Sequence, residues 1–173
     1  VFFATSTEYL GHVVSREGLK MDPKKVAAVA DIDPSSINSL EAVRSFLGLC
    51  SYYRRFIRQF AAKAAPLTAL TRKGCDVAKE SQSEECRRAI QELKTAITSE
   101  PVLTPPRDDR PFIVKTDGAS KLGIAGILSQ LGDDNRERVV GYYARSLTSA
   151  ERHWTVTEIE LLAALESIRN WRP

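Results

Sequence analysis

Cysteine and histidine are scarce in this chain of 173 residues, which has three cysteines and two histidines. Cys50, Cys75 and Cys86 form no CxxC pair, and only His12 and His153 stand beside them as soft metal ligands. Structural zinc sites draw four such ligands, usually in closely spaced pairs, so we do not expect one here. The small, odd number of cysteines also argues against a disulfide framework and favours a reducing, intracellular location.

Long apolar runs are also missing, since no stretch approaches the ~20 apolar residues that span a bilayer, and we expect no membrane partner. The N-terminal stretch "VFFATSTEYLGH" lacks the basic start of a secretory signal peptide. It also lacks an initiator Met, so we expect the chain to be part of a longer protein. The length and the ordinary share of hydrophobic residues (43%) fit one globular domain or two small ones.

Acidic residues are almost absent from one segment, which runs from Ile37 to Lys73. Its only acid is Glu41, against seven basic residues: Arg44, Arg54, Arg55, Arg58, Lys63, Arg72 and Lys73. The whole chain has a net charge of only +3, so the remainder must be net acidic. A local basic block in a nearly neutral chain indicates a polyanion partner.

Apolar periodicity predicts that this segment forms one long helix from about Leu40 to Ala62, started by a capping pair of Asn38 and Glu41. The buried side would hold Leu40, Val43, Leu47, Cys50, Tyr53, Ile57 and Phe60. The opposite side would hold Arg44, Gly48, Ser51, Arg55 and Arg58. A glycine inside a helix costs about 1 kcal/mol relative to alanine, but between arginines it lets a polyanion backbone approach closely. The alternative is a solvated basic face with an incidental glycine.

Local signals predict the other N-terminal elements. Residues 2–15 form two short strands, and "SREGL" makes the turn after them. A short helix follows in "MDPKKVAAVADI", capped by Asp22 with Pro23 in its first turn. A second helix lies in "SEECRRAIQELKTAITSE" and buries Cys86, Ile90, Leu93 and Ile97. The polar stretch "CDVAKESQ" is expected to be a loop, and the proline-rich "PVLTPPRDDRP" a linker.

The pattern changes after Pro111 to three strands and a helix. The strands are "FIVKTD", "GIAGILSQL" and "RVVGYYARS", and their short connections predict antiparallel hairpins. The helix lies in "SAERHWTVTEIELLAALESIRNW", where Thr155 and Glu158 match a capping box. Its buried stripe is expected to hold Leu161, Ala164, Leu165 and Ile168.

A carboxylate, Asp117, ends the first of these strands, although ionised carboxylates are costly to bury. It can converge with Glu158 or Glu160 of the helix on a hard cation such as Mg²⁺. Two such ions ~3.5–4 Å apart can support cleavage of a phosphodiester. The capping box already occupies Glu158, which leaves Glu160 as the freer ligand. The alternatives are a turn-capping aspartate and an exposed helical glutamate.

Five blocks of the sequence together resemble the Pol polyprotein of gypsy-type LTR retrotransposons, in the same order and over essentially the whole chain. They are "EYLGHVVSREGLKMDPKKVAAV", "LEAVRSFLGLCSYYRRFIRQFAAKAAPLTAL", "AIQELKTAITSEPVL", "TDGASKLGIAGILSQ" and "ERHWTVTEIELLAAL". The resemblance implies an α/β (α+β) fold in three parts. Residues 1–21 would be the hairpin that ends the reverse transcriptase palm, 22–110 a mainly helical thumb and connection, and 111–173 the N-terminal, βββα part of an RNase H-like domain.

The resemblance also implies roles for particular residues. "YLGH" is similar to the hairpin that helps to hold the primer, and "RSFLGLCSYYRRFI" to the thumb helix that follows the minor groove of the template–primer duplex. It therefore adds Arg54 to Arg44, Gly48, Ser51, Arg55 and Arg58 as nucleic-acid-binding candidates. Asp117 matches the first metal-binding carboxylate of RNase H and Glu160 the second, in a catalytic site where the family uses two Mg²⁺ ions.

The sequence departs from the family pattern in two ways. The family usually has T-D-A-S with a glycine five residues after the aspartate, whereas Gly118 intervenes here and Gly123 is six residues on. This extra residue either shifts Asp117 or is harmless variation of the turn. In addition, no Y-x-D-D polymerase motif and no later "TDH" carboxylate block occur in the chain.

We therefore expect a fragment of a reverse transcriptase–RNase H that has neither activity by itself. Its expected partners are an RNA–DNA hybrid or a DNA duplex and the remainder of the Pol polyprotein. Its expected location is the cytoplasm or nucleus, inside retroelement particles. The alternative is a non-catalytic, domesticated or relic nucleic-acid-binding fragment.

Overall fold

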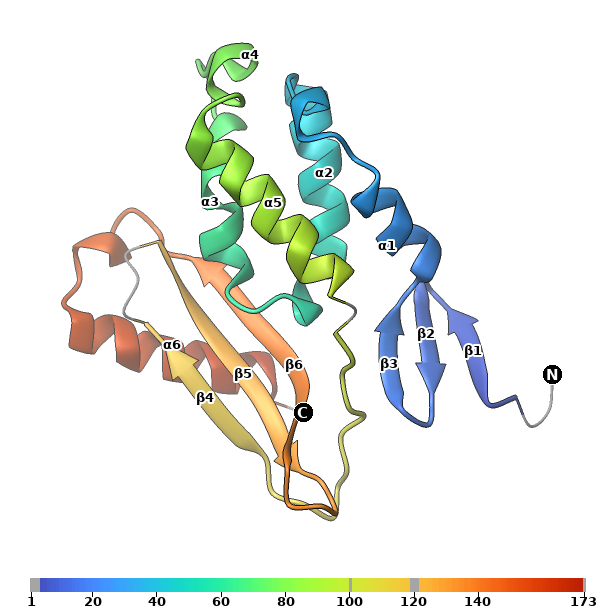
Figure 1. Ribbon diagram of the computed structural model, residues 1–173. Helices are drawn as coiled ribbons and strands as arrows, with labels where there is room; N and C mark the ends of the chain where they lie inside the picture. The colour runs from blue at the N-terminus through green and yellow to red at the C-terminus, as the bar shows by residue number, and fades with distance from the viewer. Residues whose placement is uncertain (1–3, 100, 119–121, 173) are drawn as a thin grey trace.

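Two small sheets and a group of helices make up the chain (Figure 1). The computed structural model describes residues 4–99, 101–118 and 122–172. Each sheet has three antiparallel strands, in the orders β1-β2-β3 and β4-β5-β6. The mixed helix-and-sheet class predicted from the sequence is confirmed. Among the described residues, no helix combines the length and hydrophobicity needed to cross a bilayer.

The first sheet has one strand more than the sequence predicted. Its strands are β1 (Ser6–Tyr9), β2 (His12–Ser15) and β3 (Gly18–Met21). The expected turn in "SREGL" was wrong in extent, because only two residues turn before β3 begins at Gly18. Leu19 of β3 exchanges backbone hydrogen bonds of 2.8 and 2.9 Å with Leu103, so this strand is supported from a distant part of the chain.

The helical part begins as predicted and then bends where a straight helix was expected. Asp22 caps α1 (Pro23–Ala30) by accepting from the Lys24 N–H. The predicted helix from Leu40 to Ala62 was wrong, since α2 (Leu40–Tyr52) is followed by the 3₁₀ turn η2 (Arg54–Phe56) and by α3 (Phe60–Leu70). The same apolar spacing continues through the bend, so periodicity did not reveal it. At the bend, η2 and α3 pack against β6, and apolar spacing along the sequence gives no sign of such tertiary contacts.

The other helices of the N-terminal half agree with the sequence predictions in part. Ser39, and not Asn38, caps α2 by accepting from the Ala42 N–H at 3.2 Å. Helix α5 (Glu84–Thr98) is capped by Ser83 and buries all four predicted residues. The stretch expected to be a loop contains the one-turn helix α4 (Val77–Glu80). Two further 3₁₀ turns are η1 (Pro34–Ser36) and η3 (Glu151–His153).

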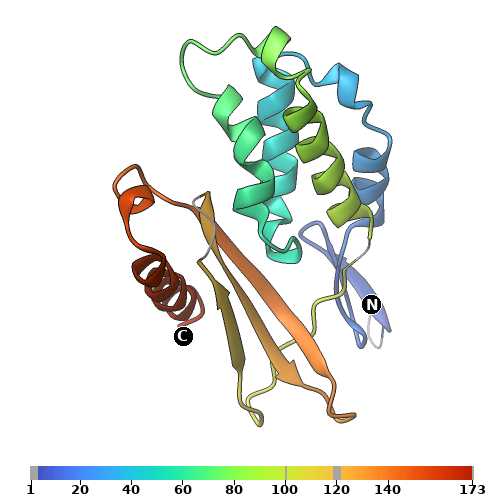
Figure 2. The same ribbon diagram turned by 60° about the vertical axis from the view of Figure 1, so that its left-hand side comes forward.

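The second sheet and its helix follow the predicted βββα order. The elements are β4 (Ile113–Asp117), β5 (Gly123–Leu131), β6 (Glu137–Ser146) and α6 (Val156–Asn170). Helix α6 covers one side of the sheet, while η2 and α3 pack on the other side (Figure 2).

The buried face of α6 differs from the prediction. The stripe of Leu161, Ala164, Leu165 and Ile168 was wrong, because Leu161 is 71% and Ile168 60% exposed. The helix instead buries Ile159, Leu162, Ala163 and Ser167. A Cβ on Gly126 of β5 would lie only 2.3 Å from Ser167 Oγ, so small residues allow this face to approach the sheet closely. Helix α6 has two faces with apolar residues, and its own sequence does not indicate which one meets the sheet.

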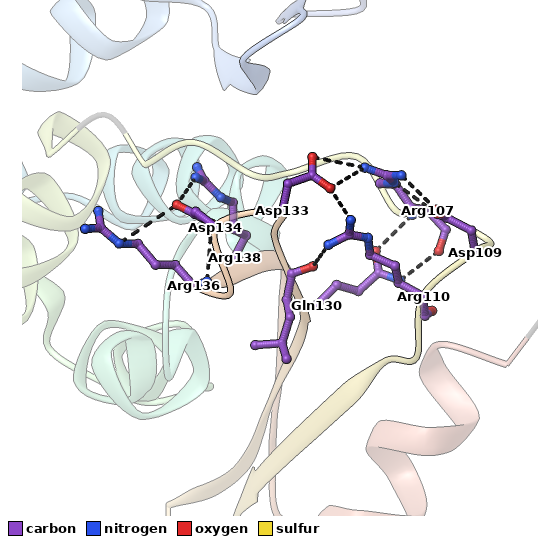
Figure 3. A network of polar contacts seen from close by, with 9 residues as sticks. Arg107, Asp109, Arg110, Gln130, Asp133, Asp134, Arg136 and Arg138 are labelled. Atoms are coloured by element: carbon purple, nitrogen blue, oxygen red, sulfur yellow. Dashed lines mark hydrogen bonds and ion pairs between the residues drawn. The ribbon is translucent and has the colours of Figure 1, made fainter.

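The proline-rich segment between the two halves is fixed by hydrogen bonds. Thr104 N–H donates to Val139 O at 2.7 Å. The buried Gln130 side chain donates to the carbonyls of Arg107 (2.8 Å) and Arg110 (3.0 Å) and accepts from the Arg107 N–H (2.9 Å). Arg107 forms an ion pair with Asp109, and Arg107 and Arg110 both form ion pairs with Asp133 (Figure 3). The segment is therefore bound along the second sheet, while the predicted division at residues 21 and 110 stays a prediction.

Candidate functional site

Asp117 lies at the end of β4, where it pairs with Ala125 of β5. Its half-buried carboxylate accepts a hydrogen bond through Oδ2 from Gln59 Nε2 at 2.8 Å. The next residue, Gly118, is buried and donates its N–H to Glu160 Oε2 at 3.1 Å. The two carboxylates predicted from the sequence therefore come from a strand end and a helix. The Glu160 carboxylate accepts a hydrogen bond from the residue that directly follows Asp117.

Gly118 permits this arrangement because β4 ends almost in contact with α6. A Cβ at this position would lie 2.6 Å from Ile159 O and 2.8 Å from Glu160 Cα, closer than real Cβ contacts. The additional glycine of "TDGAS" thus allows the strand end to pack against the first turns of the helix. Residues 119–121 of this turn lie outside the described part of the chain.

Glu158 is held elsewhere, as the capping-box prediction required. Its Oε2 accepts from the Thr155 N–H at 2.7 Å and from the Thr155 hydroxyl at 2.8 Å. The backbone hydrogen bond, followed by the hydroxyl bond, lowers the pKa of Glu158 below its usual value. Glu160 is consequently the glutamate of α6 that faces the end of β4.

The Asp117 and Glu160 side chains fit part of a site for a hard divalent cation. Carboxylate oxygens are the ligands that Mg²⁺ prefers, and it is often bound by one or two carboxylates with waters completing the octahedron. Within the described ranges, no group of three or more His, Cys, Asp or Glu side chains is arranged to hold a metal. Of the described residues, Asp117 and Glu160 could therefore supply at most two ligands at this position.

The predicted basic surface is divided between α2, η2 and the turn that follows η2. Arg44, Gly48 and Ser51 lie exposed on α2, and no atom lies within 4 Å of a Cβ built on Gly48. Arg54 and Arg55 belong to η2 instead, so the single helical face drawn from periodicity was wrong. All six candidates nevertheless lie on the surface.

The bend after Tyr52 turns the later arginines toward the second sheet. Arg54 and Arg55 line a groove of about 540 Å³ together with aromatic residues, which include Tyr52, Phe112, Tyr142 and Trp171. Arg58 lines a small cavity of about 90 Å³ that also contains Asp117. The basic segment thus extends from α2 to the neighbourhood of the carboxylates.

Sequence reasoning missed three residues that join the parts of the site. Tyr52 and Tyr53 donate their hydroxyls to the carbonyls of Leu10 and Gly11, the latter at 2.8 Å. They hold the β1–β2 turn of "YLGH" against α2, and burial is the main cause that raises the pKa of Tyr53. Gln59 makes the contact with Asp117 described above. No local signal marks these residues, because each contact crosses more than 40 positions of sequence.

The chain is similar to known proteins over almost its whole length. The family described as "RNase H-like domain found in reverse transcriptase" matches residues 83–173. The retrovirus-related Pol polyproteins from the Drosophila melanogaster transposons opus and gypsy are 38% and 39% identical to 99% and 98% of the chain. The Tf2-3 polyprotein of Schizosaccharomyces pombe is 28% identical over 99% of it. The chain spans 17% of the length of each Drosophila protein.

Solved structures share the fold at lower identity. The foamy viral protease-reverse transcriptase in complex with an RNA/DNA hybrid superimposes on 96% of the chain with a TM-score of 0.76 and 21% identity, over 22% of that protein. Its complex with dsDNA gives a TM-score of 0.75 and covers 34% of that chain. The arrangement of both sheets and the helices is therefore one found in a reverse transcriptase.

Proposed function

Because the chain belongs to the family of the RNase H-like domain found in reverse transcriptase, we propose that it is a segment of a gypsy-type retrotransposon reverse transcriptase–ribonuclease H. The segment binds the RNA–DNA template–primer duplex and contributes two carboxylates to the ribonuclease site. It works intracellularly, as part of a larger Pol polyprotein.

The hydrogen bond from the Gly118 N–H to Glu160 Oε2 is the observation that most directly supports the proposed contribution to a ribonuclease site. It brings a carboxylate of α6 to the residue next to Asp117, as a shared metal site requires. Asp117 and Glu160 would hold Mg²⁺, which supplies activation of water and stabilisation of the leaving oxygen in phosphodiester cleavage. Glu158 takes no part, because it caps α6.

The exposed arginines support the binding part. Arg44, Arg54, Arg55 and Arg58 stand on the surface. Gly48 lies one helical turn after Arg44 on α2 and leaves open space there for a nucleic-acid backbone. The foamy viral relatives of this fold were solved with dsDNA and with an RNA/DNA hybrid. Phosphate contacts of this kind bind without sequence preference and weaken as the salt concentration rises.

Fluorescence anisotropy with a labelled RNA–DNA hybrid tests this part. We expect Arg55→Gln with Arg58→Gln to weaken binding about tenfold or more and to reduce the slope of log K against log salt by about 2. The matched control is Arg87→Gln with Arg88→Gln, two exposed arginines of α5, with less than a twofold effect. Equal losses in the two double variants would show that binding is not located on this surface.

A non-catalytic nucleic-acid-binding role is the second candidate, because the exposed basic residues include Arg44 on α2 and Arg54 and Arg55 on η2, which do not line the cavity beside Asp117. It predicts that hybrid binding is unchanged by Asp117→Ala and by removal of divalent ions. The ribonuclease proposal predicts, in contrast, that Mg²⁺ binding depends on Asp117 and Glu160.

A further inference from the structure

Gln59 connects the helical part of the chain to the candidate metal site. It precedes α3, and its side-chain amide donates to Asp117 Oδ2 at 2.8 Å across 58 positions of sequence. Arg58 and Lys115 also line the cavity in which this bond lies. The segment that carries the candidate arginines therefore contacts Asp117 directly, through the residue after Arg58.

The backbone of Gln59 has an unusual conformation that directs the side chain to this place. Its φ is +54°, in the left-handed region that glycine, asparagine and aspartate tolerate best. Among the described residues, only Leu10 and Asn135 are other non-glycine residues with positive φ. A glutamine held there is costly, and such strain persists where surrounding contacts over-determine it, often at functional sites.

Close packing of α3 on the second sheet brings Gln59 within reach. A Cβ on Gly123 of β5 would lie 3.3 Å from the Ala61 Cβ, so the first turn of α3 lies almost against the strand. Two small cavities, of about 140 and 90 Å³, adjoin this contact, and both are lined by Gln59, Asp117 and Ala125. The amide and the carboxylate thus face each other at the junction of the two parts.

We propose that Gln59 is a positioning residue for the candidate metal site, whose amide fixes the orientation of the Asp117 carboxylate and ties it to the segment that carries the candidate arginines. Carboxylates that ligate metals are commonly held by such outer hydrogen bonds, and their loss typically costs 10–100-fold in metal affinity or activity. The inference rests on the proposed role of Asp117 as a metal ligand.

Titration of the chain with Mn²⁺, followed by electron paramagnetic resonance of the free ion, tests the inference. We expect Gln59→Gly to weaken Mn²⁺ binding about tenfold or more, because it removes the amide. Glycine suits a φ of +54°, so the urea midpoint of this variant stays the same or rises. A purely structural role would instead lower the urea midpoint and leave the affinity unchanged.

Two further variants make the result specific. Gln59→Asn tolerates the same backbone conformation but is one methylene shorter, so its affinity should fall between those of the wild type and Gln59→Gly. Asn135→Gly makes the same kind of backbone change at an exposed turn away from Asp117, and it should leave Mn²⁺ affinity unchanged.

The outcomes separate this inference from the proposed function. If Gln59→Gly binds Mn²⁺ like the wild type while Asp117→Asn loses binding, the metal site stands and the role of Gln59 is refuted. If Asp117→Asn binds like the wild type, or if the wild type shows no saturable binding, the metal site fails and the inference fails with it.

Discussion

The helical part and the βββα part of this chain are packed very differently. Helices α1, α2, α3 and α5 enclose a large apolar cluster, in which Ile90, Leu93 and Ile97 of α5 are inaccessible to solvent. The βββα part has a separate, much smaller cluster made of Ile124, Leu147, Ile159, Leu162 and Ala163. The outer face of α6 meanwhile leaves leucine and isoleucine side chains exposed.

The well-packed part and the part that holds the candidate metal ligands are therefore different regions of the chain. Regions with few buried apolar contacts open at lower free energy than well-packed cores. Both candidate metal ligands belong to the thinly packed part, and Gln59, which contacts Asp117 at the junction, comes from the helical part. We infer that the helical part serves as the support on which the carboxylates are held, through Gln59 and through the packing of α3 on β5 and β6.

The largest expected effect comes from a matched pair of core substitutions. Ile90→Ala should lower the free energy of unfolding by about 3–5 kcal/mol, because the rigid helical cluster cannot close the cavity. Ile159→Ala should cost about 2–3 kcal/mol, since α6 can settle onto its small cluster. Urea unfolding followed by circular dichroism measures both values. A larger loss for Ile159→Ala would reverse the comparison.

Substitution by alanine should change the free energy of unfolding in opposite directions at two glycines. Gly118→Ala forces a Cβ against the backbone of α6 and should destabilise the βββα part by about 1–3 kcal/mol. Gly48→Ala places a methyl group in open space within α2 and should stabilise the chain by about 0.5–1 kcal/mol. Thermal unfolding of the two variants decides this. A neutral Gly118→Ala would mean that β4 does not pack against α6 as closely as described.

A third test concerns an ion pair in the βββα part. Glu151 accepts from Arg145 at 2.9 and 3.0 Å, and this bond, more than the backbone bond from Thr148, lowers the pKa of Glu151 to about 2. A depressed pKa contributes stability that is present above the unfolded value of 4.5 and is lost as the pH falls toward 2. The contribution lost by pH 3 should be about 1–2 kcal/mol, after allowance for partial exposure of the pair.

The measurement is urea unfolding of wild type, Glu151→Gln and Glu92→Gln at pH 6 and pH 3. Glu151→Gln should remove most of the loss between the two pH values, whereas Glu92→Gln, an exposed glutamate of α5, should not change it. If all three proteins lose the same stability, the Arg145–Glu151 pair is not responsible.

The sequence predicted those features that local interactions determine. The four buried positions of α5, the cap of α1 by Asp22 and the capping box of α6 each depend on residues within a few positions of one another. The resemblance to gypsy-type Pol polyproteins also picked out Asp117 and Glu160, which the fold then brings to adjacent places.

The features that the sequence missed depend on tertiary contacts. The bend between Tyr52 and Phe60 leaves apolar spacing intact, and α6 could have packed on either apolar face. Gln59 carries no signal of its own, since its importance arises from a hydrogen bond to a residue 58 positions away. In each case the deciding partner lies in the second sheet.

The most direct test of the central claim is a nuclear magnetic resonance spectrum of the ¹⁵N-labelled chain with a trace of Mn²⁺. The ion broadens amide signals near its binding site. We predict broadening centred on the amides of Gly118 and Glu160, which Glu160→Gln abolishes and Glu158→Gln leaves intact. Broadening centred on another acidic cluster, or unchanged by Glu160→Gln, would contradict the claim that Asp117 and Glu160 together form a metal site.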